Sequence, residues 1–346
     1  MRRDNPAMKL ATYRDGSRDG QLVVVARDLG SAHYATGIAT RLQQALDDWN
    51  FISPQLHELS ETLNAGKARH AFAFDARRCM APLPRAWRWA NASACLSDAE
   101  RPRGGREPVM PAGPHPAVPI YQGASDDVLG PCDDIRADEA LGIDFEPEVA
   151  VVTGDLPPGS PAEAALEGVR LLMIANDLSL RELLAAERAS GGGPLQGKPA
   201  TAFGPVAVTP DELGSAWRGG RVHLAWQCEW NGRSLGRGEA ESSFHFGQLL
   251  AHLCRTRGVR AGSIVGSGTV SNGDASRGYS CIAEQRAIET MEGGAPLTGF
   301  MRHGDTLRIE TKDERGQSMF GAIEQTLRPL SPSTPEAGRA PRPQLS

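Results

Sequence analysis

The chain has 346 residues, of which 40% are hydrophobic and 23% charged, and its formal net charge is −5. This composition is typical of a globular protein with a sizeable core. The acidic balance argues against a nucleic-acid partner, and the sequence has no apolar run of about 18 residues that could span a membrane. Residues 1–16 lack the apolar stretch of a secretory signal peptide, so we expect a cytoplasmic protein.

The six cysteines and eight histidines show no metal-binding spacing. No Cys-x-x-Cys, His-x-x-x-His or His-Glu-x-x-His pattern occurs. In a cytoplasmic chain of this length, the cysteines are expected to be free thiols. A zinc site is not indicated.

The first part of the chain, residues 1–80, is expected to form a small β-rich domain. Short strands separated by Asp-Gly turns are predicted within 8–36, and apolar residues recur with helical period over 38–64. Residues 81–119 are predicted to be a connector that ends in a lid-like loop. The segment 101–119 of this connector is rich in Pro and Gly, which favour extended or turn conformations.

Residues 120–330 show the pattern of a mixed α/β domain. We expect helices at 161–167, 179–189 and 245–256, and strands at 146–153, 169–175, 221–230, 262–270, 280–290 and 305–325. Residues 331–346 are polar and rich in Pro, which predicts a disordered tail.

Three acids precede an apolar run in the segment DFEPEVAVV, residues 144–152. In a strand, residues two apart share a face, so Asp144, Glu146 and Glu148 would form one row. Pro147 has no N–H and indicates a strand start or an edge strand. A divalent cation with oxygen ligands would relieve the repulsion between the acids. A hydrated edge face explains this stretch, taken alone, equally well.

A second polar position follows the apolar run that ends at Asn176-Asp177. Ser179 and Glu182 have the spacing of a capping box for the next helix, but capping does not explain Asp177. Functional groups of α/β proteins often lie where a strand ends. Arg181, in the helix, could pair with Asp177 or bind a substrate carboxylate.

Two later loops carry further candidates. Lys198 lies between Gly and Pro in a loop that leads to an apolar strand, which favours it over most basic residues as a functional cation. Residues 266–268 read Gly-Ser-Gly but match neither a dinucleotide-binding nor a P-loop pattern, so we reject a nucleotide site. The small residues would allow a ligand to approach the backbone, and Thr269 offers a hydroxyl group.

Five segments in this order resemble the fumarylacetoacetate hydrolase family: DFEPEVAVVTGD, ANDLSLREL, GKPATAFGPVAVTPDE, RAGSIVGSGTVSN and GYSCIAEQRAIE. The resemblance covers roughly residues 8–328 and is strongest to the full-length bacterial members. It implies a small N-terminal β-rich domain followed by a mixed, β-rich α/β catalytic domain of the β-roll type. It also implies a homodimer.

The resemblance further implies a divalent ion, Mg²⁺ or Ca²⁺ with Mn²⁺ as a further option. Its ligands would be Glu146, Glu148 and Asp177, whereas Asp144 matches no ligand and is expected to support the site or the fold. The implied reaction is hydrolysis of a carbon–carbon bond in a β-diketo acid of the fumarylacetoacetate or acylpyruvate type. Relatives with this fold also decarboxylate, hydrate or isomerise, so the fold does not determine the reaction.

Other family positions match residues here one by one. Lys198 and Glu284 match the lysine and glutamate that assist catalysis, and Tyr121, Arg181 and Thr269 match positions that contact the substrate. A role in aromatic amino-acid catabolism is implied by the resemblance alone.

One position departs from the family pattern. Bacterial relatives carry a general-base histidine in the segment that corresponds to 93–105, and Asp98 stands at that place, followed by the helix-breaking Pro102. An ordinary aspartate pKa of about 3.9 suits water activation poorly. Three readings stay open. Asp98 is the base, or His115 replaces it, or the protein binds or decarboxylates a dicarboxylic keto acid without hydrolysing it.

Overall fold

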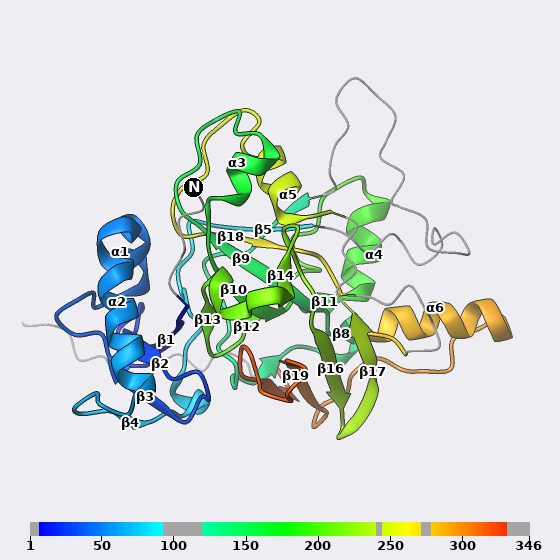
Figure 1. Ribbon diagram of the computed structural model, residues 1–346. Helices are drawn as coiled ribbons and strands as arrows, with labels where there is room; N and C mark the ends of the chain where they lie inside the picture. Colours follow the sequence, from blue (N-terminus) through cyan, green and yellow to red (C-terminus); the bar gives the residue numbers. More distant parts are fainter. Residues whose placement is uncertain (1–6, 93–119, 240–243, 271–277, 331–346) are drawn as a thin grey trace, which may run out of the picture.

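The computed structural model describes residues 7–92, 120–239, 244–270 and 278–330 (Figure 1). Its centre is an 11-stranded sheet with the strand order β4-β3-β2-β1-β13-β10-β9-β18-β5-β6, in which β12 also pairs with β10. The strands are β1 (Lys9–Tyr13), β2 (Gln21–Val25), β3 (Ser31–Tyr34), β4 (Phe72–Ala73), β5 (Arg88–Ala92), β6 (Ile120–Gly123), β9 (Pro147–Thr153), β10 (Val169–Asn176), β12 (Ala202–Phe203), β13 (Ala207–Val208) and β18 (Ser263–Gly266).

A second, five-stranded sheet has the order β17-β16-β19-β20-β7, and two short strand pairs, β8–β11 and β14–β15, lie outside both sheets. These strands are β7 (Ile135–Arg136), β8 (Ile143–Asp144), β11 (Ser179–Leu180), β14 (Trp217–Arg218), β15 (Arg221–Val222), β16 (Ala225–Trp230), β17 (Arg233–Glu239), β19 (Thr306–Lys312) and β20 (Ile323–Arg328). The helices are α1 (Leu42–Asp47), α2 (Trp49–Asn64), α3 (Ala162–Leu166), α4 (Arg181–Ala189), α5 (Phe246–Leu253) and α6 (Ile282–Gly293). The mixed, β-rich α/β fold is thereby confirmed.

Both faces of the large sheet are buried, because alternate residues of its strands pack into two different core clusters. In β1, Leu10 packs into one core cluster while its neighbour Ala11 packs into the other. In β2, Leu22 and Val24 face the first cluster, and Val23 and Val25 the second. Successive strand residues point to opposite faces, so strands buried on both sides are almost entirely apolar.

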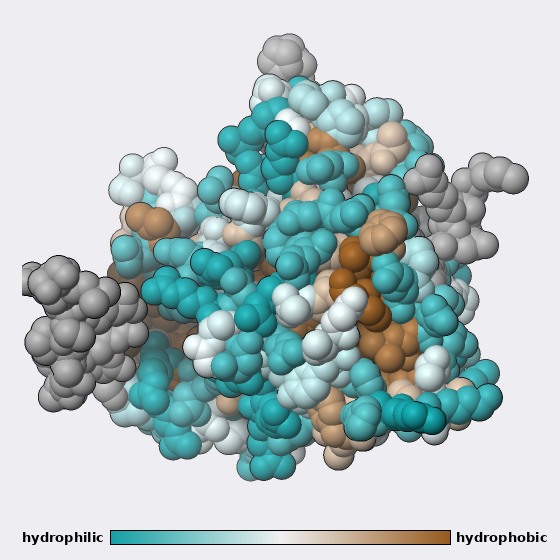
Figure 2. Space-filling view, turned by 90° about the vertical axis from the view of Figure 1, so that its left-hand side faces the viewer, coloured by the Kyte–Doolittle hydropathy of each residue, from teal (hydrophilic) through white to brown (hydrophobic). Residues whose placement is uncertain are grey.

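The N-terminal strands and the helices α1 and α2 form a unit at one end of the molecule, drawn in blue in Figure 1. This unit shares the large sheet with the rest of the chain, because β1 pairs antiparallel with β13. The predicted connector contains a central strand of the same sheet, β5, which lies between β18 and β6. The described part of the face that carries the N-terminal unit is mostly hydrophilic, with small, separate apolar patches (Figure 2).

The predicted strand segments 221–230 and 305–325 each contain two strands, and two helical segments also differ from the prediction. The single helical segment over 38–64 is two helices, because the backbone at Asp48 leaves the helical conformation between α1 and α2. The strand predicted at 280–290 is wrong, because these residues form helix α6. Residues of this segment such as Ala283, Gln285 and Arg286 favour helix, and α6 stands on the periphery where no neighbouring strand pairs with it (Figure 1).

Within the described ranges, no helix combines the length and the apolar character that crossing a membrane requires.

Candidate active site

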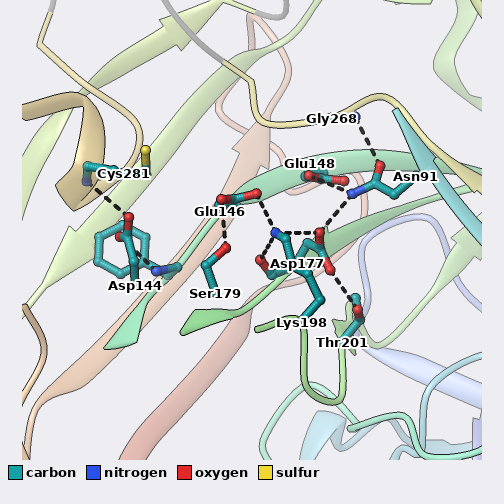
Figure 3. Close-up of polar contacts among 12 residues, drawn as sticks. Asn91, Asp144, Glu146, Glu148, Asp177, Ser179, Lys198, Thr201, Gly268 and Cys281 are labelled. Atoms are coloured by element: carbon teal, nitrogen blue, oxygen red, sulfur yellow. Dashed lines mark hydrogen bonds and ion pairs between the residues drawn. The ribbon is translucent and has the colours of Figure 1, made fainter. Parts of the chain in front are cut away.

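Two neighbouring strands place three carboxylates together. In the antiparallel pair β9–β10, Glu148 lies opposite Ala175, and the backbone N–H of Asp177 donates to the carbonyl oxygen of Glu146 at 2.9 Å. All three acids are buried, and one oxygen of each lies within 4.8 Å of the others. Figure 3 shows Glu146, Glu148 and Asp177 around one point at the end of these strands. The hydrated edge face is therefore wrong for Glu146 and Glu148, since β9 is a central strand.

Lys198 lies between two of these acids. Its Nζ is 2.8 Å from Glu146 Oε2 and 2.8 Å from Asp177 Oδ2, and the lysine is itself buried (Figure 3). The loop in front of it packs closely on α4, because a Cβ at Gly197 would lie 2.6 Å from Leu184 Cγ. The two carboxylates hold the pKa of Lys198 above its ordinary value, although burial alone would lower it. The lysine is a fixed positive charge.

Asn91, at the end of β5, is a site residue that the sequence analysis missed. Its Nδ2 donates to Glu148 Oε1 at 2.9 Å and to Asp177 Oδ2 at 2.8 Å, and its Oδ1 accepts from the N–H of Gly268 at 3.1 Å. The absence of a side chain at Gly266 makes room for it, since a Cβ there would lie 2.1 Å from Asn91 Oδ1. The available signal was a single amide in the apolar strand RWANA.

The acids differ in how their charge is balanced. Burial raises the pKa of Glu148 well above its ordinary range, and the nearby Asp177 and Glu146 raise it further. Burial also acts to raise the pKa of Glu146, but Lys198 and Arg181 outweigh it and lower that pKa to about 2. Glu148 Oε2 has no hydrogen-bond partner among the described residues. A cluster of carboxylate oxygens with one unsatisfied buried oxygen fits a divalent cation.

Asp144 lies apart from the three acids and forms an ion pair with Arg181 (Figure 3). Strand β8 ends at Asp144 and β9 begins only at Pro147, so the predicted single row of three acids is wrong. Arg181 does not pair with Asp177; its Nη2 lies 2.6 Å from Asp144 Oδ2 and 2.8 Å from Glu146 Oε1. Arg181 therefore connects Asp144 to the carboxylate cluster.

The predicted capping box at the start of α4 is also wrong. The N-cap residue of α4 is Leu180, and no side chain caps the helix. Ser179 lies in the short strand β11, where its Oγ donates to Glu146 Oε1 at 2.8 Å. Strand β11 pairs with β8, so Ser179 lies in a strand and its hydroxyl group contacts Glu146 instead of the first turn of the helix.

Glu146 of this cluster lines a solvent-open pocket of about 270 Å³, together with Asn91 and Lys198. Tyr121, Arg181, Lys198 and Thr269 line this pocket, so the structure brings these predicted residues together. The Tyr121 hydroxyl donates to Asp177 Oδ2, and burial, followed by the charges of Asp177 and Glu148, raises the pKa of Tyr121. The pocket combines acids that could bind a metal with hydroxyl groups and cations that could bind an anionic substrate.

The family models decide the identity of the fold. Residues 8–85 match the fumarylacetoacetase N-terminal domain 2 model, and residues 92–328 match the fumarylacetoacetate (FAA) hydrolase C-terminal model. The chain belongs to the fumarylacetoacetate hydrolase family. A search of the curated proteins finds no match to the sequence.

Solved structures share the fold of this family member over nearly its whole length. A fumarylacetoacetate hydrolase from Exiguobacterium antarcticum is 17% identical, with a TM-score of 0.64 and coverage of 93% of this chain and 99% of that one. A maleylpyruvate hydrolase from Sphingobium sp. SYK-6 is 15% identical, with a TM-score of 0.60 and coverage of 93% and 100%. A 2-hydroxyhepta-2,4-diene-1,7-dioate isomerase from Mycobacterium marinum is 16% identical, with a TM-score of 0.57 and coverage of 93% and 98%.

The remaining predicted catalytic residues of this family member are not among the lining residues of the pocket or are outside the described ranges. Glu284 is buried in the first turn of α6, where its Oε2 accepts from the N–H of Ser280 at 3.0 Å. It does not line the pocket, and its catalytic role stays a prediction. Asp98 and His115 lie outside the described residues, as do Pro102 and the predicted tail. Among the described residues that line the pocket there is no histidine.

Proposed function

We propose that this member of the fumarylacetoacetate hydrolase family is a divalent-metal-dependent hydrolase that cleaves a carbon–carbon bond in a β-diketo acid. The observation that supports it best is the buried group Glu146, Glu148 and Asp177, of which Glu146 lines a pocket beside Lys198. The three acids would hold Mg²⁺ or Ca²⁺, with Mn²⁺ as a further option, because these ions take oxygen ligands. When bound, the ion would supply Lewis acidity toward substrate oxygens.

The side chains of the pocket have complementary roles in this proposal. Arg181 binds a substrate carboxylate, and Lys198 contributes a fixed positive charge where negative charge develops. The hydroxyl groups of Tyr121 and Thr269 orient the substrate by hydrogen bonds to its oxygens. Hydrolysis also needs a base that takes a proton from the attacking water. Asp98 is the candidate for it, with His115 as the alternative.

A second candidate function is favoured by the sequence, because Asp98 stands where bacterial relatives carry the general-base histidine. The protein would then bind or decarboxylate a dicarboxylic keto acid without hydrolysing it, since a missing base costs about 10²–10⁴ in rate. A homodimer, a small keto-acid substrate and a place in aromatic amino-acid catabolism stay predictions from the resemblance.

The deciding experiment measures turnover of fumarylacetoacetate and acetylpyruvate with added Mg²⁺, for the unmodified protein and for Asp98→His. Turnover by the unmodified protein that disappears in Asp177→Asn and on metal removal supports the hydrolase. Full activity of the metal-free protein would refute metal dependence. A gain of about 10² or more only in Asp98→His would favour the base-deficient alternative.

A further inference from the structure

Three cationic side chains line the site pocket, and they differ in whether a carboxylate of the protein pairs with them. Arg181 and Lys198 are each paired with buried carboxylates at 2.6–2.8 Å. Arg188 lines the same pocket from α4, but its guanidinium makes no ion pair or hydrogen bond with any residue in the described ranges. It is the cation of this pocket that no carboxylate of the described residues neutralises.

The adjacent acid does not neutralise Arg188. Both carboxylate oxygens of Glu187 accept backbone N–H groups, from Leu195 at 3.1 Å, Gln196 at 2.6 Å and Gly197 at 3.2 Å. Consecutive helix residues also point in different directions. Arg188 is in the last turn of α4, where a positive charge interacts favourably with the helix dipole. This interaction explains a basic residue at this position of the helix, but it does not explain why the side chain lines the pocket.

The spacing along α4 suggests the shape of the ligand. Arg181, Leu184 and Arg188 all line the pocket, at positions i, i+3 and i+7 of one helix. Seven residues make two turns, or about 10 Å along the axis, so the three side chains share a face. The pocket wall thus offers a cation at each end and an apolar side chain between them.

We propose that Arg188 determines substrate specificity by binding the distal carboxylate of a dicarboxylic keto acid, a role that rests on the proposed function. The guanidinium group presents parallel N–H donors that match a carboxylate in a bidentate arrangement. Arg181 and Lys198 serve the end of the substrate that reacts, and Leu184 contacts its carbon chain. Monocarboxylic acylpyruvates leave Arg188 unused.

The kinetic test compares fumarylpyruvate, whose acyl group ends in a carboxylate, with acetylpyruvate, whose acyl group ends in a methyl, for the unmodified protein, Arg188→Gln and Arg260→Gln. Arg260 is a matched control because its side chain is 82% exposed and it does not line the pocket. In Arg188→Gln, we expect KM for fumarylpyruvate to rise about 10- to 100-fold, with kcat/KM for acetylpyruvate unchanged. An equal loss for both substrates would overturn the proposal.

A binding measurement separates this proposal from the proposed hydrolysis. Titration calorimetry with fumarate and crotonate, four-carbon acids with two carboxylates and one, needs no turnover. We expect the unmodified protein and Arg260→Gln to prefer fumarate, and Arg188→Gln to lose that preference. Loss of the preference supports Arg188 even if neither acylpyruvate is hydrolysed. No preference in the unmodified protein, or one that persists in Arg188→Gln, would overturn the proposal.

Discussion

Glu148 differs from its two neighbours in how its carboxylate is satisfied. Glu146 and Asp177 each contact Lys198, whereas Glu148 accepts one hydrogen bond from Asn91 through Oε1. Its Oε2 is buried without a partner in the described part of the chain. A group in this state costs stability unless a cation or a proton satisfies it. Glu148 is therefore the residue at which metal binding should have the largest effect on stability.

We expect Glu148→Gln to separate metal binding from folding. The metal-free variant should be at least as stable as the unmodified protein, because burial and neighbouring acids already raise the pKa of Glu148 and disfavour its charged form. Magnesium at 100 times its Kd should stabilise the unmodified protein by about 2.7 kcal/mol, and the variant should lose most of this gain. Thermal unfolding with and without MgCl₂ measures both effects.

The exposed acid Glu163 provides the control for this prediction. Glu163→Gln removes the same charge and should keep the full magnesium effect. If magnesium stabilised Glu148→Gln as much as the unmodified protein, Glu148 would not be a metal ligand.

At the scale of elements, Asp144 connects three segments that are distant in sequence. Its oxygens accept from the N–H groups of Ile282 and Ala283 at 2.8 and 2.9 Å, which satisfies the N-terminus of α6. They also accept two hydrogen bonds from Arg181 and one from the N–H of Phe145. One carboxylate thus positions the start of α6 and the arginine that contacts Glu146.

We expect Asp144→Ala to loosen α6 before the rest of the fold. Removing the carboxylate leaves the N–H groups of Ile282 and Ala283 without their acceptor, at a cost of about 1–3 kcal/mol each, while Arg181 keeps Glu146 as a partner. Asp144→Asn keeps one acceptor oxygen and should cost less. Amide hydrogen exchange should become faster in α6 than in α2. If amide exchange became faster by the same factor in both helices, Asp144 would not specifically hold the start of α6. Asp155→Ala, which removes an exposed acid, is the control.

At the scale of the whole molecule, the N-terminal unit contacts the segment between β19 and β20 through a buried lysine. Lys9 of β1 donates through Nζ to the carbonyl oxygen of Met319 at 2.6 Å and to that of Ser318 at 3.3 Å. Glu212 lies 3.9 Å away. Burial lowers the pKa of Lys9 from 10.5 to about 8, although Glu212 partly opposes this shift.

This shift predicts a pH dependence of stability. Between about pH 8 and 10.5 the unfolded chain binds more protons at Lys9 than the folded chain does. The contribution of Lys9 to stability therefore rises with pH in this window, by about 3 kcal/mol in total, and is constant below it. Urea unfolding from pH 7.5 to 10 should show the free energy of the unmodified protein rising relative to Lys9→Met. Lys67→Met, at an exposed lysine, should show no such difference.

If the difference between the unmodified protein and Lys9→Met did not change with pH, the charge on Lys9 would not be disfavoured by folding. Taking the difference between two proteins removes the contributions of other titrating groups. The buried thiols Cys79 and Cys228 are among these, since burial raises the pKa of each.

The sequence by itself determined the features that depend on local spacing. The apolar run after Glu148 forms β9, and the apolar run before Asp177 forms β10. Such buried strands can be predicted because they consist of consecutive apolar residues. The acids Glu146, Glu148 and Asp177 and the loop cation Lys198 were identified from short ordered segments, and the structure brings them together.

Only the tertiary structure decided the partners of these residues. Asn91 reaches Glu148 and Asp177 from 57 and 86 residues away, and Asp144 meets α6 from 138 residues away. The incorrect strand at 280–290 has a different cause, because Ala283, Gln285 and Arg286 already favour the helix that these residues form. Which polar side chain satisfies which buried group depends on packing between elements, and no local pattern of residues encodes that packing.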